Sequence, residues 1–165
     1  DTGGLMVNAK TQASFSRLKY LFATRLIGKK YLALVHGIIT QDHGIIDKPI
    51  GRSKNDFRQR SAERGKKGKI RDAVTHFVVK KCAQGFSFLE IRPKTGRTHQ
   101  IRVHLKAIGY PVVGALLYAS KRPPALGFAR LALHAFSIDF ENPLGKKIFV
   151  TAPLPEDFKS ALENF

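Results

Sequence analysis

The chain has 165 residues, enough for one domain around a single core, and its 43% hydrophobic and 25% charged residues are ordinary for a globular protein. Its 29 Lys and Arg against 12 acidic residues give a formal net charge of +17, which favours a polyanionic partner, above all nucleic acid. The single Cys82 excludes an internal disulfide and a cysteine-rich zinc site, and no long apolar run or basic amphipathic anchor indicates a membrane.

The first fifty residues predict a strand, a helix and a second strand. After a glycine turn, residues 5–9 read as a strand, and the apolar residues within 11–25 form a helical stripe typical of a core helix. Residues 29–37 predict a strand bounded by glycines, with Tyr31 near its start, where an aromatic ring usually packs. Residues 45–50 predict a short edge element, because Pro49 cannot sit in a central strand.

Residues 51–72 carry nine Lys or Arg against three acids. This stretch is too polar to bury and too rich in glycine for a long helix, so it predicts a mobile loop within the single domain 1–165. The charges are either simply solvated or contact RNA phosphates. The candidates for phosphate contact are Arg52, Arg58, Arg60, Lys66, Lys67 and Lys69.

Residues 73–83 and 86–91 predict a hairpin around Gln84-Gly85, and a short amphipathic helix follows from Thr98, the expected N-cap. Ile101, Leu105 and Ile108 recur at helical spacing and should face the core. The opposite stripe then holds His99, Arg102 and Lys106, and with Arg97 in the preceding turn these residues could bind an anion or simply be solvated.

No metal is expected at this helix. His99 and His104 are five residues apart and face different ways, so they do not make the i, i+4 pair of a helical zinc site. Farther along, residues 130–140 and 147–152 predict paired strands, and residues 155–165 a closing helix. His134 lies among apolar residues and is better explained as a core residue than as a ligand. Strands outnumber helices and join mainly by hairpins, which predicts an α+β domain with a mixed, largely antiparallel sheet and flanking helices.

The run T-G-R-T-H-Q-I-R-V-H at 95–104, followed by P-V-V-G at 111–114, resembles the most recognisable segment of RluA/RluD-type pseudouridine synthases, T-G-R-[ST]-H-Q-[IL]-R-V-H and P-[IL]-[VL]-G-D. Ala115 stands where that pattern has its Asp. The family's H-R-L-D-x-x-T-x-G and L-[ML]-V-x-A-K-T segments are matched from Thr2 onward, and its K-K-Y, L-H-A and A-P-x-P segments recur at 29–31, 133–135 and 152–155. The resemblance covers essentially the whole chain.

This resemblance implies a partial pseudouridine synthase fold that isomerises a uridine extruded from structured RNA, with neither cofactor nor metal. Tyr31 would stack on the target uracil and is a candidate to take the proton released at carbon 5, and Arg102 would keep a catalytic aspartate ionised. By register that aspartate stands two positions before Asp1, which itself occupies a variable position. Because the chain begins with Asp1 and its only methionine is Met6, we expect it to be cropped or processed.

Two functions remain open at this point. The first is an RNA pseudouridine synthase, with ribosomal RNA favoured and transfer RNA the other candidate. The second is a non-catalytic RNA-binding or ribosome-assembly relative that lacks the aspartate. In either case we expect a monomer in the cytoplasm, or in an organelle of a eukaryote, whose sheet is completed by an upstream segment beside residues 5–9.

Overall fold

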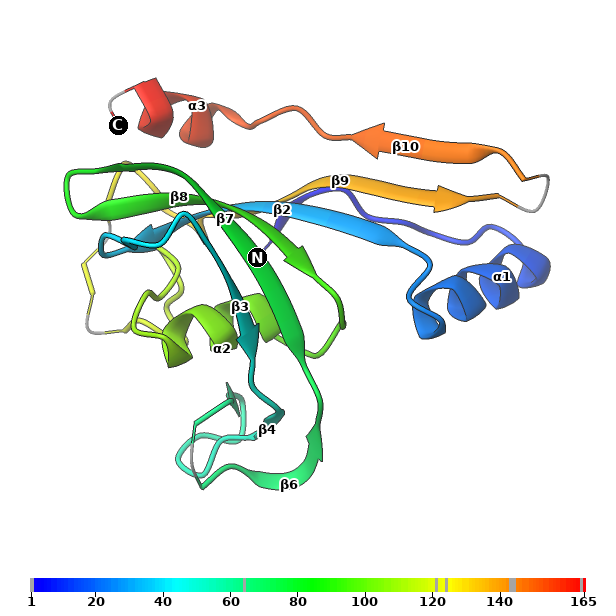
Figure 1. Cartoon of the computed structure of the whole chain (residues 1–165), viewed down its shortest axis with the longest axis horizontal. Coiled ribbons are helices and arrows are strands. Elements are labelled where there is room, and N and C mark those ends of the chain that lie inside the picture. Colours follow the sequence, from blue (N-terminus) through cyan, green and yellow to red (C-terminus); the bar gives the residue numbers. More distant parts are fainter. Residues whose placement is uncertain (1, 64, 121, 124, 143–144, 164) are drawn as a thin grey trace.

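The computed structural model describes residues 2–63, 65–120, 122–123, 125–142, 145–163 and 165. Its main sheet has the strand order β1-β9-β2-β8-β7-β3, and β10 pairs with β9 (Figure 1). Only β1 runs parallel to its neighbour, so the sheet is mixed and largely antiparallel, as predicted. Its strands are β1 (Gly3–Gly4), β2 (Gly28–His36), β3 (His43–Asp47), β7 (Val74–Ala83), β8 (Phe86–Pro93), β9 (Leu133–Glu141) and β10 (Lys147–Thr151).

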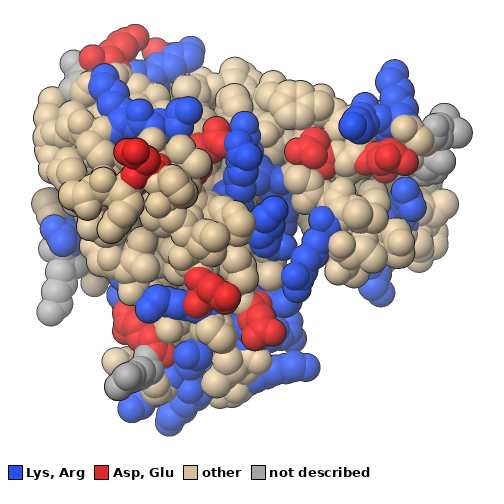
Figure 2. All heavy atoms as spheres, in the orientation of Figure 1, with Lys and Arg blue, Asp and Glu red and all other residues tan. Residues whose placement is uncertain are grey.

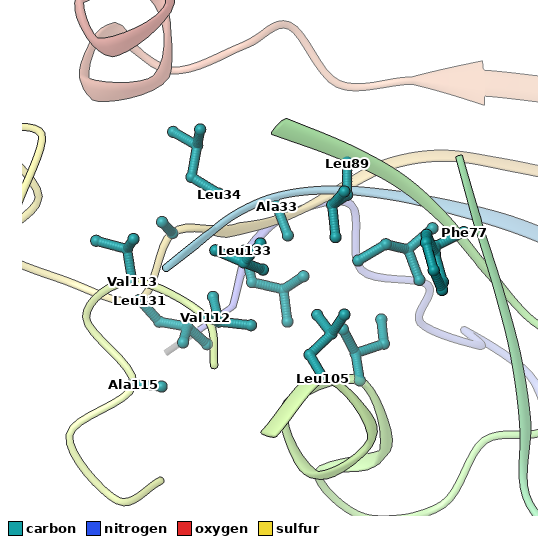
Figure 3. Close-up of a cluster of buried hydrophobic side chains, with 14 of the residues drawn as sticks. Ala33, Leu34, Phe77, Leu89, Leu105, Val112, Val113, Ala115, Leu131 and Leu133 are labelled. Carbon is teal, nitrogen blue, oxygen red and sulfur yellow. The ribbon is translucent and has the colours of Figure 1, made fainter. Parts of the chain in front are cut away.

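Helix α2 (Gln100–Ala107) packs beneath this sheet and closes the core. Leu105 is fully buried and points from α2 toward the strands, and it belongs to the same buried cluster as Leu89 and Val112 (Figure 3). The helix begins one residue later than predicted, because His99, not Thr98, is the N-cap and adopts a left-handed φ of 59° with no side-chain capping bond. Of the predicted apolar stripe, Ile101 and Leu105 are buried and Ile108 is half-buried.

The remaining helices are α1 (Gln12–Ala23) and α3 (Glu156–Glu163). The prediction that α1 is a core helix was only partly right. Leu21 is buried, but Phe15 and Phe22 are 53% and 46% exposed because α1 packs at one end of the sheet, away from the main core (Figure 1). His134 is buried with its Nε2 3.5 Å from the Ala152 carbonyl oxygen, which confirms it as a core residue.

The prediction of a strand at residues 5–9 was wrong, because these residues form no strand in the structure. The strand that pairs with β9 here is β1. After β1 the pairing continues only through the Leu5 N–H, which donates to the Ala135 carbonyl oxygen at 3.0 Å. Residues beyond Leu5 cannot pair with β9 because the rest of that edge, from Ser137 to Glu141, is taken by β10.

The prediction that residues 51–72 form a loop was also wrong, because the segment contains strands. The segment folds into a second, three-stranded sheet of order β5-β4-β6, which forms a lobe below α2 (Figure 1). Two apolar residues attach it to the main core, because Ile50, just before the segment, and Ala62, within it, are buried in the same cluster. The strands are β4 (Ile50–Arg52), β5 (Arg60–Ser61) and β6 (Lys67–Arg71).

None of the described helices is long and apolar enough to cross a membrane.

Candidate active site

A hollow of about 170 Å³ lies where the start of β2, the turn between β8 and α2, and the first turn of α2 meet. It brings together Tyr31 and Arg102, the two side chains that the sequence analysis singled out for chemistry, with Thr2 of the opening turn on its wall. Asp1 lies outside the described residues. We call this hollow the central cleft; its walls are Thr2, Lys29, Tyr31, Pro93, Thr95, Gly96, Arg97, His99, Gln100, Ile101, Arg102 and Leu133.

The turn that carries Arg97 is held by the buried side chain of Gln100. Gln100 Oε1 accepts hydrogen bonds from the Thr95 hydroxyl at 2.7 Å and from the Arg97 backbone N–H at 2.9 Å. Its Nε2 donates to the Val74 carbonyl at 3.0 Å and to the Thr75 hydroxyl oxygen at 2.9 Å. Two of these bonds hold the turn and two hold β7, so the Gln100 side chain ties the turn to the sheet. The backbone that presents Arg97 and His99 is therefore fixed before any ligand binds.

His104 extends this buried network to the start of the small lobe. Its Nε2 lies 2.9 Å from the Lys48 carbonyl oxygen, so Nε2 donates, and Nδ1 accepts from the Thr75 hydroxyl at 2.9 Å. Burial lowers the pKa of His104 below its ordinary value, which keeps the ring neutral in this arrangement. Thr95, Gln100 and His104 were not predicted as site residues, although all three belong to the recognised run at 95–104.

The polar stripe of α2 lies against Tyr118 rather than in open solvent. The guanidinium carbon of Arg102 is 5.6 Å from the centroid of the Tyr118 ring, and Lys106 Nζ is 6.0 Å from it. His99 Nδ1 is 2.7 Å from the Tyr118 hydroxyl oxygen, which also accepts the Arg60 backbone N–H at 3.1 Å. The predicted grouping of His99, Arg102 and Lys106 is therefore confirmed, and buried Tyr118 links it to β5.

Burial shifts the pKa values of three groups at the central cleft, in each case in the direction that disfavours the charged form of the group. It lowers the pKa of Arg102, whose guanidinium nevertheless stays charged at neutral pH, and it lowers the pKa of His99, which the nearby charges of Arg102 and Arg60 depress further. It raises the pKa of Tyr31, so its phenol is protonated at neutral pH. The cleft thus combines a fixed positive charge with two neutral groups that can donate or accept a proton.

Lys29 is a further cleft residue that was not predicted from the sequence. It is half-buried and also lines an adjoining hollow of about 310 Å³ on the other side of the turn. Its neighbour Lys30 pairs with Glu90 at 3.4 Å, whereas Lys29 forms no ion pair with a carboxylate of the described residues. Burial lowers the pKa of Lys29. Its position two residues before Tyr31, on the same face of β2, was the available signal.

A third hollow, of about 450 Å³, runs between the small lobe and the turn that carries Arg97. We call it the basic groove, because Arg52, Arg60, Lys69, Arg71 and Arg97 line it. Arg97 borders both the groove and the central cleft, so the two form one continuous basic region. Figure 2 shows Lys and Arg gathered on the lobe at the bottom of the view and along the middle of the molecule.

The other predicted RNA contacts lie outside the groove. Arg58 forms an ion pair with Asp56 at 2.8 Å, and neither Lys66 nor Lys67 lines the groove. Within the described part of the chain, no three His, Cys, Asp or Glu residues are grouped to hold a metal ion.

Comparison with known proteins gives consistent results. The family model described as RNA pseudouridylate synthase matches residues 1–107. The chain is 41% identical over 165 residues to the uncharacterized RNA pseudouridine synthase YlyB of Bacillus subtilis, covering 99% of this chain and 52% of the relative. It is 38% identical over 170 residues to ribosomal large subunit pseudouridine synthase C of Buchnera aphidicola, covering 99% and 53%. The chain thus spans about half the length of these curated relatives.

The fold leads to the same family. The human RNA pseudouridylate synthase domain containing 1 superposes with a TM-score of 0.76 and 31% identity, covering 89% of this chain and 62% of that one. With the family model matching well over half of the residues, the chain belongs to the RNA pseudouridylate synthase family, as the RluA/RluD-type run at 95–104 predicted.

Proposed function

We propose that this chain is the C-terminal part of the catalytic domain of an RNA pseudouridine synthase, which isomerises a specific uridine in structured RNA. The observation that carries the proposal is the central cleft, where Tyr31, Arg102 and the opening turn at Thr2 meet. Family membership and the basic groove beside the cleft support it. Ribosomal RNA is the favoured substrate, because the Buchnera aphidicola relative is named for the large ribosomal subunit, and transfer RNA is the other candidate.

The reaction needs a group that acts on the ribose, and the aspartate expected two positions before Asp1 is the candidate. Thr2 and Arg102 line the same cleft, which supports placing a carboxylate three residues before Thr2 close to Arg102. A carboxylate in a water-poor pocket becomes protonated unless a positive charge compensates its burial. Arg102 supplies that charge, and packing against Tyr118 holds it in place.

Tyr31 and its neighbours would hold the extruded base. Taking a uridine out of its stack costs a few kcal/mol, and an aromatic face recovers roughly 1–3 kcal/mol per base. In the reaction the C1′–N1 bond breaks, a C1′–C5 bond forms, and the proton lost from C5 is balanced by one gained at N1. The Tyr31 phenol stacks on the ring and is the candidate relay for the C5 proton.

Backbone contacts would supply the energy of extrusion. Arg52, Arg60 and Lys69 of the groove, together with Arg97 at its junction with the cleft, are the first candidates for phosphate contact. Arg58, Lys66, Lys67, His99 and Lys106 complete the proposed RNA-binding set. Such an enzyme would act in the cytoplasm, where its RNA is.

The decisive experiment uses the full-length protein with its upstream residues and measures pseudouridine formation on ribosomal and transfer RNA. We expect turnover on a single uridine, and loss of turnover when the upstream aspartate is replaced by Asn. RNA binding without pseudouridine formation by the unaltered protein would refute the enzyme. It would favour the non-catalytic RNA-binding relative.

A further inference from the structure

Phe57 is 86% exposed, more than any other large apolar side chain among the described residues. It sits in the loop between β4 and β5, whose strands carry Arg52 and Arg60 of the basic groove. Most exposed apolar side chains on a protein occur singly and mean little. A phenylalanine ring offered to solvent from a basic lobe is different, because aromatic rings interleaved with positive charge are the means by which proteins bind unpaired nucleic acid.

The loop around Phe57 is held by its own polar residues. Asp56 Oδ1 accepts the Arg58 backbone N–H at 2.9 Å, and the Arg58 guanidinium pairs with the same carboxylate at 2.8 Å. The Gln59 N–H donates to the Asp56 carbonyl at 3.0 Å, and the Ser53 N–H donates to the Gln59 carbonyl at 3.1 Å. These bonds hold the backbone on both sides of Phe57, which reduces the entropy that a ligand must remove on binding.

The loop is also anchored to the cleft. The Arg60 backbone N–H donates to the Tyr118 hydroxyl, the same group that contacts His99. The position of the loop is therefore fixed relative to the residues that would hold the target uridine. Arg58, a candidate for phosphate contact, has its charge partly opposed by Asp56 and also shapes this turn.

We infer that Phe57 stacks on an unpaired base of the bound RNA, beside phosphates held in the basic groove. This inference rests on the proposed RNA substrate and adds a contact outside the central cleft. It assigns the small lobe two kinds of interaction, electrostatic through the groove and stacking through one ring. Stacking is tolerant of base identity, so the contact would add affinity and register rather than sequence preference.

The 165 residues contain no tryptophan, so Phe57→Trp places the only indole of this stretch at the proposed contact, and the emission of the parent protein is subtracted as background. We would titrate the full-length Phe57→Trp protein with an RNA hairpin carrying a uridine-rich loop, and separately with inorganic polyphosphate. We expect the hairpin to quench the indole emission with the same midpoint as binding followed by gel shift. Polyphosphate, which has no bases, should leave the emission unchanged.

Matched variants complete the test. Phe57→Ala should weaken hairpin binding roughly 5- to 150-fold without changing its salt dependence, since no charge is removed. Phe15→Ala and Phe15→Trp, at an exposed Phe that lines neither the cleft nor the groove, should bind as the parent does and show no quenching. Hairpin binding with unchanged indole emission would overturn the inference and leave the enzyme standing. Failure of the parent protein to bind RNA would refute both.

Discussion

Replacing Gln100 by Met tests whether the recognised run is held by the buried network. The substitution keeps the shape of the side chain but removes four hydrogen bonds, those to Thr95, Arg97, Val74 and Thr75. A buried hydrogen bond contributes about 1 kcal/mol net, and a buried group left without a partner costs more. Because Thr95 and Thr75 are buried, we expect Gln100→Met to lower the free energy of unfolding by about 3–5 kcal/mol.

Urea unfolding followed by circular dichroism measures this change. With a denaturant slope of about 2 kcal/mol/M, the midpoint should fall by about 2 M. Thr98→Ala is the control, because Thr98 is exposed and its loss should change stability by no more than about 0.5 kcal/mol. A loss below about 1 kcal/mol for Gln100→Met would refute the view that this network holds the turn.

Three further predictions concern chemistry, binding and pH. In the full-length protein, Arg102→Ala should lower turnover about 10²- to 10³-fold with RNA affinity largely kept, and equal losses in both would make Arg102 only a phosphate contact. Lys66→Ala with Lys67→Ala should weaken binding uniformly across RNA sequences and flatten its salt dependence, which filter binding at several salt concentrations would measure; an unchanged salt slope would mean that these charges are merely solvated. Burial depresses the pKa values of His36, His99 and His104 below 6.5. As the pH falls, these imidazoles are therefore protonated in the unfolded chain before they are protonated in the folded one. Stability should therefore be full above pH 6.5 and fall as the pH drops through the folded-state pKa values, and equal free energies of unfolding at pH 7.5 and 5.5 would contradict this.

The main sheet could be predicted from the sequence because its signals are local. Residues 29–37 and the hairpin around Gln84-Gly85 carry apolar patterns bounded by turn residues, and β2, β7 and β8 lie at or within one residue or two of those patterns. The errors came from contacts between distant segments. Residues 5–9 have the pattern of a strand, but β10 takes the edge they would need, and no local signal reveals that competition.

The small lobe could not be predicted for a related reason. Composition dominated the interpretation of residues 51–72, where charges outnumber apolar residues. The strands form because a few residues reach the core from outside the basic run, notably Ile50 and the hydroxyl of Tyr118, which accepts the Arg60 N–H. The sequence places Arg52, Arg60 and Lys69 on a predicted loop. In the structure, these three residues line one groove.

The run at 95–104 serves two purposes that a motif match cannot separate. Arg97, His99 and Arg102 line the central cleft, whereas the side chains of Gln100 and His104 make the buried hydrogen bonds that hold this part of the chain. A substitution at either kind of position would lower the proposed turnover, so loss of turnover alone does not identify a catalytic group. Substitutions at the two kinds of position should change the free energy of unfolding by different amounts. Arg102 is only half-buried, whereas Gln100 and His104 are buried and hydrogen-bonded. Unfolding measurements on each variant therefore decide which residues act on the RNA and which hold the cleft in shape.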